Sequence, residues 1–77
     1  MPIKTLDFHF NKQPEGFRLD VYLREASQPL ATANFNFPRS FLTGVELKNL
    51  DFDVRDPAGR VARLREFGRR LHQQIFT

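Results

Sequence analysis

The sequence contains no cysteine and no tryptophan. Without cysteine, neither a disulfide nor a metal site made of thiolates can stabilise the fold. The two histidines, His9 and His72, are far apart in the sequence and lack the short spacing of metal-binding histidines. The sequence therefore predicts no metal site and no bound cofactor.

Long apolar runs are also missing, and no segment has the length and apolar character of a membrane-spanning helix. The first residues lack the charged and then apolar pattern of a secretory signal peptide. Together with the absence of cysteine, these features predict a soluble cytoplasmic protein that does not contact a membrane.

Motifs for catalysis are absent as well. The sequence has no glycine-rich phosphate loop, and Ser27 and Ser40 have no recognisable base or orienting group. His9 falls on the polar side of a predicted strand, where we expect it to be exposed, and His72 falls beside the apolar stripe of a predicted helix. We therefore expect no catalytic residue and a protein that is not an enzyme.

The chain is short, and its 77 residues predict one small domain over residues 1–77. A chain of this size buries only about 60% of the surface that its unfolded form exposes. The core must come from apolar side chains, and nine phenylalanines supply much buried area per residue.

Three segments alternate between apolar and polar residues, which is typical of half-buried strands. We predict strands over about 3–11, 16–25 and 29–37, separated by the turn-like stretches "NKQPEG" and "EASQP". Short links favour an antiparallel β-meander of three strands with one apolar face.

Two helices are predicted after the third strand. "TGVE" is a capping box in which Thr43 and Glu46 bond reciprocally, so a short helix is expected over about 43–50. Asp56 and Pro57 suit the start of a long helix over 57–76. The segment 50–56 fits either a strand or an anchored loop.

The long predicted helix has an apolar stripe at steps of three and four residues. The residues of the stripe are Val61, Leu64, Phe67, Leu71 and Ile75. Gly68 lies on the same stripe, which indicates that another backbone or an aromatic ring of a strand comes close there. The predicted fold is therefore α+β, a three-stranded meander with both helices on its apolar face. The long helix is expected to lie across Leu6, Phe8, Leu19, Val21, Ala33 and Phe35.

Charge is distributed unevenly along the chain. Residues 1–56 carry seven Lys/Arg against eight Asp/Glu, whereas residues 57–77 carry five Arg against one Glu. The basic residues are Arg60, Arg63, Arg65, Arg69 and Arg70. They suit phosphate contacts, so one alternative is a small basic nucleic-acid-binding regulator that uses the C-terminal helix. The other is a solvated face on which some arginines pair with the aspartates of residues 51–56.

Three apolar residues at segment ends exceed what so small a chain readily buries: Phe41, Leu42 and Phe76. They either form a docking surface for a protein partner or complete the core. A free edge of the meander offers a second route, because an unpaired edge can pair with another copy and give a homo-oligomer.

The stretches "FNFPRSFLTGVELKNLDFD" and "DPAGRVARLREFGRRLHQQIF" resemble the N-terminal segment ahead of the caspase-like protease domain in bacterial CHAT proteins and related conflict or signalling proteins. The matching residues are Phe35, Phe37, Pro38, Leu47, Leu50, Glu66, Phe67, Gly68, Leu71, Ile75 and Phe76. His72 stands where such relatives have an aromatic residue, and this chain lacks the cysteine of the protease. The resemblance therefore implies an accessory module that docks a caspase-like protease or another larger effector. The function favoured from the sequence is a non-enzymatic adaptor or regulatory module of a bacterial immune or signalling system.

Overall fold

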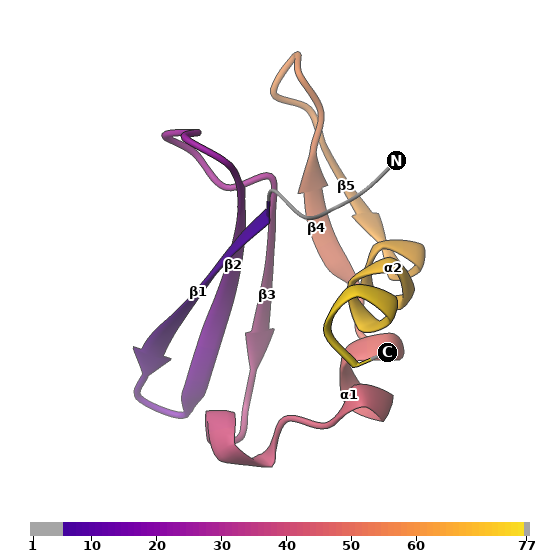
Figure 1. The fold of residues 1–77 in the computed structure, drawn as a ribbon. Coiled ribbons are helices and arrows are strands. Elements are labelled where there is room, and N and C mark those ends of the chain that lie inside the picture. Colours follow the sequence, from indigo (N-terminus) through magenta and orange to yellow (C-terminus); the bar gives the residue numbers. More distant parts are fainter. Residues whose placement is uncertain (1–5, 77) are drawn as a thin grey trace.

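A computed structural model describes residues 6–76, without the side chain of Phe76. Within this range the chain forms a sheet of five antiparallel strands with short helices on one side (Figure 1). The elements are β1 (Leu6–Gln13), β2 (Gly16–Leu23), β3 (Ala31–Phe35), the 3-10 helix η1 (Arg39–Phe41), α1 (Gly44–Lys48), β4 (Phe52–Arg55), β5 (Val61–Leu64) and α2 (Arg65–Phe76). The protein is therefore α+β and mostly sheet.

The strands follow one another in the order β1-β2-β3-β4-β5. β1 and β2 pair along their whole length, from Leu6 opposite Leu23 to Gln13 opposite Gly16. β3 and β4 pair only at Ala31 opposite Val54 and at Thr32 opposite Asp53. The β4–β5 hairpin is thus joined to the other strands over a short stretch and diverges from them beyond it (Figure 1).

The predicted three-stranded meander with a helix over 57–76 is wrong. Of the two alternatives for 50–56, the strand is correct, because β4 spans Phe52–Arg55. Residues 61–64, expected to be helical, form β5, and α2 begins only at Arg65. Asp56 and Pro57 therefore do not start a helix.

Residues 56–59 instead form the turn of the β4–β5 hairpin. The amide of Gly59 donates to the carbonyl of Asp56 at 2.9 Å, and the amide of Asp56 donates to the carbonyl of Arg60 at 2.9 Å. Gly59 has a φ of 85°, which suits the last residue of a three-residue hairpin loop. An Asp-Pro pair fits the first two positions of a type I turn as well as it fits a helix start. The glycine two residues later distinguishes the hairpin.

The other predicted elements agree more closely with the structure. The predicted strands 3–11, 16–25 and 29–37 correspond to β1, β2 and β3, and residues 3–5 lie outside the described part. The helix expected over 43–50 is α1, which is shorter. Its capping box is confirmed, since Thr43 Oγ1 accepts from the Glu46 amide at 3.2 Å and Glu46 Oε2 accepts from the Thr43 amide at 3.1 Å.

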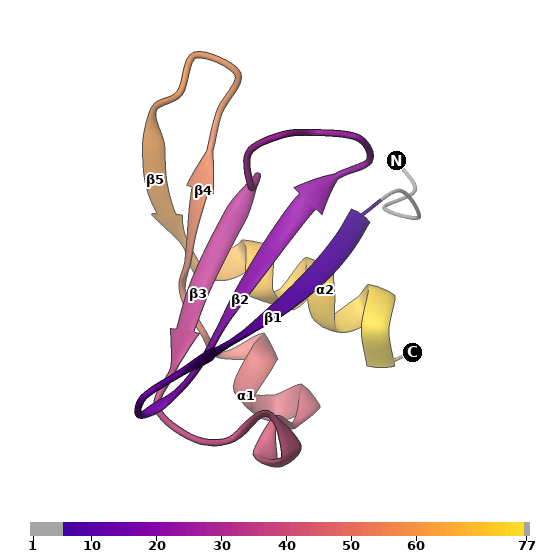
Figure 2. The same ribbon diagram turned by 90° about the vertical axis from the view of Figure 1, so that its left-hand side faces the viewer.

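The core lies between the sheet and the helices, which share one side of it (Figure 2). The buried apolar residues of the described chain are Phe17, Leu19, Val21, Ala31, Ala33, Phe35, Leu47, Phe52 and Leu71. From α2, Leu71 is fully buried and Phe67 packs its ring 5.5 Å from that of Phe52. The predicted stripe is therefore only partly in the core: Val61 and Leu64 belong to β5, and Ile75 is exposed.

Gly68 is the point of closest contact between α2 and the rest of the protein. A Cβ atom at this position would lie 2.5 Å from the carbonyl oxygen of Leu47 and 2.7 Å from that of Leu50. It would also lie 3.3 Å from Cε1 of Phe52. The expectation that a backbone or a strand ring approaches this glycine is confirmed, and the contact sets how close α2 lies to α1 and β4.

We expect Gly68→Ala to lower the free energy of unfolding. At an open helix position the same change raises it by about 1 kcal/mol, but overpacking a tight contact costs roughly 1–3 kcal/mol. We expect a net loss of about 1–2 kcal/mol, measured by urea denaturation. Gln74→Ala, at an exposed position of the same helix, is the control and should change stability by less than about 0.5 kcal/mol. A stabilised Gly68→Ala variant would contradict the contact.

Candidate functional site

The face of the sheet opposite the helices is polar, and no element of the described chain covers it (Figure 2). One row of paired residues crosses every strand of this face. His9 lies opposite Asp20, Asp20 opposite Thr32, Thr32 opposite Asp53, and Asp53 opposite Arg63. This row places a histidine, two carboxylates and a guanidinium side by side across the sheet.

Asp20 is the one charged residue buried among the described residues, with 5% of its surface exposed. Its carboxylate accepts hydrogen bonds from Asn11 Nδ2 at 2.8 Å, Arg18 Nε at 3.1 Å and Thr32 Oγ1 at 2.7 Å. These donors come from β1, β2 and β3, so the carboxylate ties three strands in one register. Asp20 is therefore a structural cross-strand link, which sequence reasoning missed because alternation alone placed it on an exposed face.

His9 is exposed, as predicted, and its ring centroid lies 4.5 Å from that of Tyr22. His72 on α2 is half-buried. Within residues 6–76, no three His, Asp or Glu side chains come together as potential metal ligands. The polar face thus holds a hydrogen-bonded carboxylate and an exposed histidine whose ring is tilted by 39° against that of Tyr22.

The basic residues of the C-terminal part do not form one helix face. Arg60 lies in the hairpin turn and Arg63 in β5, so only Arg65, Arg69 and Arg70 belong to α2. Four of the five are paired with carboxylates: Arg60 with Asp56 at 2.8 Å, Arg63 with Asp53 at 3.1 Å, Arg65 with Asp51 at 3.1 Å, and Arg70 with Glu66 at 3.3 Å. The alternative that some arginines pair with the aspartates of residues 51–56 is confirmed.

The three predicted docking residues have different environments. Phe41, at the end of η1, is 63% exposed. Leu42 is half-buried and packs against the core, and the side chain of Phe76 lies outside the described part. Val45, which sequence reasoning missed, is 68% exposed on the first turn of α1.

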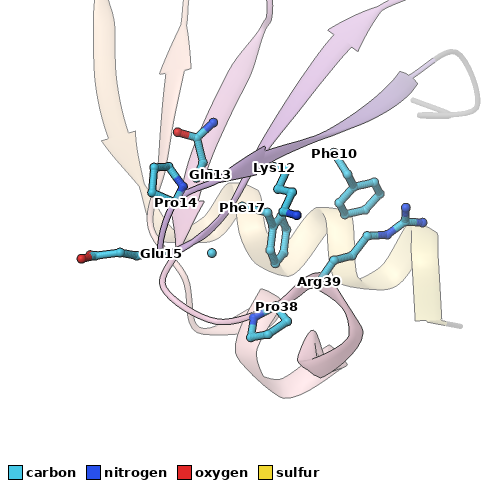
Figure 3. A pocket seen from close by; sticks show the side chains of 9 residues that line it. Phe10, Lys12, Gln13, Pro14, Glu15, Phe17, Pro38 and Arg39 are labelled. Atoms are coloured by element: carbon cyan, nitrogen blue, oxygen red, sulfur yellow. The ribbon is translucent and has the colours of Figure 1, made fainter.

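A pocket of about 490 Å³ lies between the β1–β2 turn and the start of η1 (Figure 3). The rings of Phe10 and Phe17 line it with centroids 5.7 Å apart. Pro38, Lys12 and Arg39 complete much of the wall. The guanidinium carbon of Arg39 sits 4.0 Å from the centroid of Phe10, in a cation–π contact. No pattern in the sequence indicates this pocket, because its walls come from segments more than 20 residues apart.

Gly16 allows the turn to close against the end of β3. A Cβ atom there would overlap the carbonyl oxygen of Phe35. Close to this contact, the rings of Phe17 and Phe35 stack at 4.5 Å with an interplanar angle of 5°. One wall of the pocket is therefore held in place by the core.

Comparison of the chain with protein-family models, with curated proteins and with solved structures found no match. None of the helices in residues 6–76 has both the length and the apolar character needed to cross a membrane. The functional proposal below therefore depends on the residues and the geometry of this chain.

We expect Asp20→Ala to lower the free energy of unfolding by at least about 3 kcal/mol, because it leaves three part-buried donors without their acceptor and each such loss costs roughly 1–3 kcal/mol. Chemical denaturation measures the change. Asp7→Ala is the matched control, since Asp7 lies on β1, on the same face of the sheet as Asp20, and is exposed. Equal, small effects of both substitutions would show that the Asp20 bonds do not hold the register.

The ion pairs also predict weak binding to nucleic acid. We expect no retention of the wild type on a duplex DNA column at low salt, because the paired arginines are already neutralised by carboxylates. Replacing Asp51, Asp53 and Asp56 together by Asn frees three arginines and should produce retention that falls steeply with salt. Salt-sensitive retention of the wild type at the same level would favour the nucleic-acid alternative instead.

Proposed function

We propose that this protein is a non-enzymatic protein–protein interaction module, of adaptor or regulatory type, that binds a larger protein through one end of the sheet. The surface, here called the turn-end surface, comprises Phe41, Val45 and the pocket beside Arg39. Phe41 and Val45 are the most exposed large apolar side chains of the described chain. They lie on η1 and α1, at the same end as the β1–β2 turn (Figure 2).

The direction in which Val45 points follows from the way α1 is fixed. The capping box at Thr43 sets the first turn of the helix, and Leu47 is fully buried. Residues two apart on a helix lie on nearly opposite sides. Val45 must therefore face outward when Leu47 faces the core.

The free energy of burying Phe41 and Val45 is not used in folding and can contribute to binding a partner. The core is already filled without Phe41 and Val45, and fully burying a Phe or Val side chain is worth roughly 1.5–3 kcal/mol. Phe41 and Val45 are four residues apart in the chain, on consecutive elements, and contiguous exposed apolar surface is typical of interaction sites. This supports docking over the second reading, in which Phe41 completes the core.

For the partner, the resemblance to CHAT-associated segments supports a caspase-like protease or another larger effector of a bacterial immune or signalling system, in the cytoplasm. A second route to association is the sheet edge. Within the described chain, β1 pairs only with β2 and β5 only with β4, so either edge could accept a strand of another copy. Because most of the arginines are paired, the nucleic-acid alternative has less support.

Site-specific photo-cross-linking in cells tests the proposal. A photoreactive amino acid at position 41 or 45 should yield a discrete adduct with one protein, which mass spectrometry identifies. The same group at position 24, in the exposed turn after β2, should not yield it. Excess wild-type protein should compete for the adduct, whereas a Phe41→Ser/Val45→Ser variant should not.

The double variant also separates docking from folding. Because both side chains are exposed, we expect its free energy of unfolding to change by no more than about 1 kcal/mol in all. Identical adducts from positions 24, 41 and 45, or unfolding of the double variant, would contradict the docking role of the turn-end surface.

A further inference from the structure

We propose that the pocket between the β1–β2 turn and η1 binds a carboxylate carried on an apolar group, and that this group is the C-terminal residue of a partner polypeptide. The inference rests on the proposed function, because it names what the turn-end surface recognises. The volume of the pocket, about 490 Å³, falls in the range of roughly 300–1,000 Å³ that is usual for ligand pockets.

The apolar half of the pocket suits an apolar side chain. Phe10 presents its half-buried ring, Phe17 contributes a small surface because only 3% of it is exposed, and Pro38 adds a further apolar surface. Phe17 is held by its stack on Phe35. On the other side, the amide of Phe41 donates to the carbonyl of Pro38 at 2.9 Å and keeps η1 in place. The pocket is thus formed before a ligand arrives, which lowers the entropic cost of binding.

The charged half of the pocket suits an anion. Lys12 and Arg39 line it, and no carboxylate of residues 6–76 forms an ion pair with either of them. Glu15 also lines the pocket, but its side chain points away from the two rings (Figure 3). This contrasts with the C-terminal arginines, most of which are paired. Two cations therefore meet an apolar pocket without a charge partner from the protein itself.

Arg39 is placed to bind a carboxylate. Its guanidinium carbon lies over the Phe10 ring, 4.0 Å from the centroid. A guanidinium has its N–H donors in one plane, where they can bond both oxygens of a carboxylate. The ring also holds the long side chain in one place, so less freedom is lost on binding. Lys12 adds a second positive charge on the β1 side.

The position of the pocket points to a polypeptide terminus. Arg39, which lines the pocket, and the exposed Phe41 are two residues apart in the chain, at the two ends of η1, so a polypeptide that packs on Phe41 lies within reach of the pocket. A terminal carboxylate next to an apolar side chain combines both features required here.

NMR titration of the labelled protein tests the proposal. The probes are N-acetylphenylalanine, which has the carboxylate, and N-acetylphenylalaninamide, which lacks it. We expect the acid to shift the amide signals of residues 10–13, 15–17 and 39–41 and to bind at least tenfold more tightly than the amide. Equal affinities, or the same shifts caused by inorganic phosphate at similar affinity, would overturn the assignment of a carboxylate on an apolar group.

Substitutions distinguish specific binding by Arg39 and Lys12 from a general effect of the protein's net charge. Arg39→Gln and Lys12→Gln should each weaken binding of the acid about fivefold or more, with unchanged spectra of the free protein elsewhere. Lys48→Gln removes an exposed cation of α1 and should leave the affinity unchanged. Equal losses in all three variants would show that only net charge matters and would overturn the site.

Two peptides distinguish the source of the carboxylate. A hexapeptide that ends in a free phenylalanine should bind at least fivefold more tightly than N-acetylphenylalanine, and its C-terminal amide should lose that affinity. If the small acid binds as well as the peptide, the polypeptide assignment fails. If no probe binds while position 41 still gives its discrete adduct, the pocket fails and the docking surface stands.

Discussion

The fold depends on the contact between Gly68 and the carbonyl oxygens of Leu47 and Leu50. Only a residue without a side chain lets α2 come so close to the end of α1 and to the ring of Phe52. Among the described side chains of α2, only Leu71 is fully buried. The close approach at Gly68 therefore supplies a second contact between α2 and the rest of the protein.

Much of the fold could be predicted from local patterns. The capping box at Thr43 and the alternation of β1 to β3 depend on neighbouring residues, and both predictions were correct. The long helix was wrong because Asp56 and Pro57 start helices and turns alike, and because Val61 and Leu64 fit the spacing of the helix stripe by coincidence. The short alternating run of β4, together with Gly59, was the signal for a second hairpin. Whether such a segment forms a strand or a helix is decided by pairing with other strands, and this pairing depends on the whole chain.

The candidate site was less predictable, because it is made by contacts between distant segments. Phe41 could be selected as apolar and at a segment end, but only the burial of Leu47 shows that Val45 faces outward. The stack of Arg39 on Phe10 joins η1 to β1, and no sequence pattern indicates it. The bonds of Asp20 likewise cross three strands. By contrast, pairing of the C-terminal arginines with the aspartates of residues 51–56 could be predicted from charge alone. Arg39 and Lys12 of the pocket differ from these arginines, because they form no ion pair with a carboxylate of the described chain.

The account is tested most directly by nuclear Overhauser effects between Gly68 and its neighbours in solution. We expect strong cross-peaks from the Hα protons of Gly68 to the ring protons of Phe52, because the ring atom Cε1 would lie 3.3 Å from a Cβ atom at Gly68. The same spectrum should show no cross-peaks from Phe41 to the core residues of the sheet. Gly68 protons that contact only their own helix would contradict the helix contact, and a Phe41 ring packed against the strands would contradict the exposed docking surface.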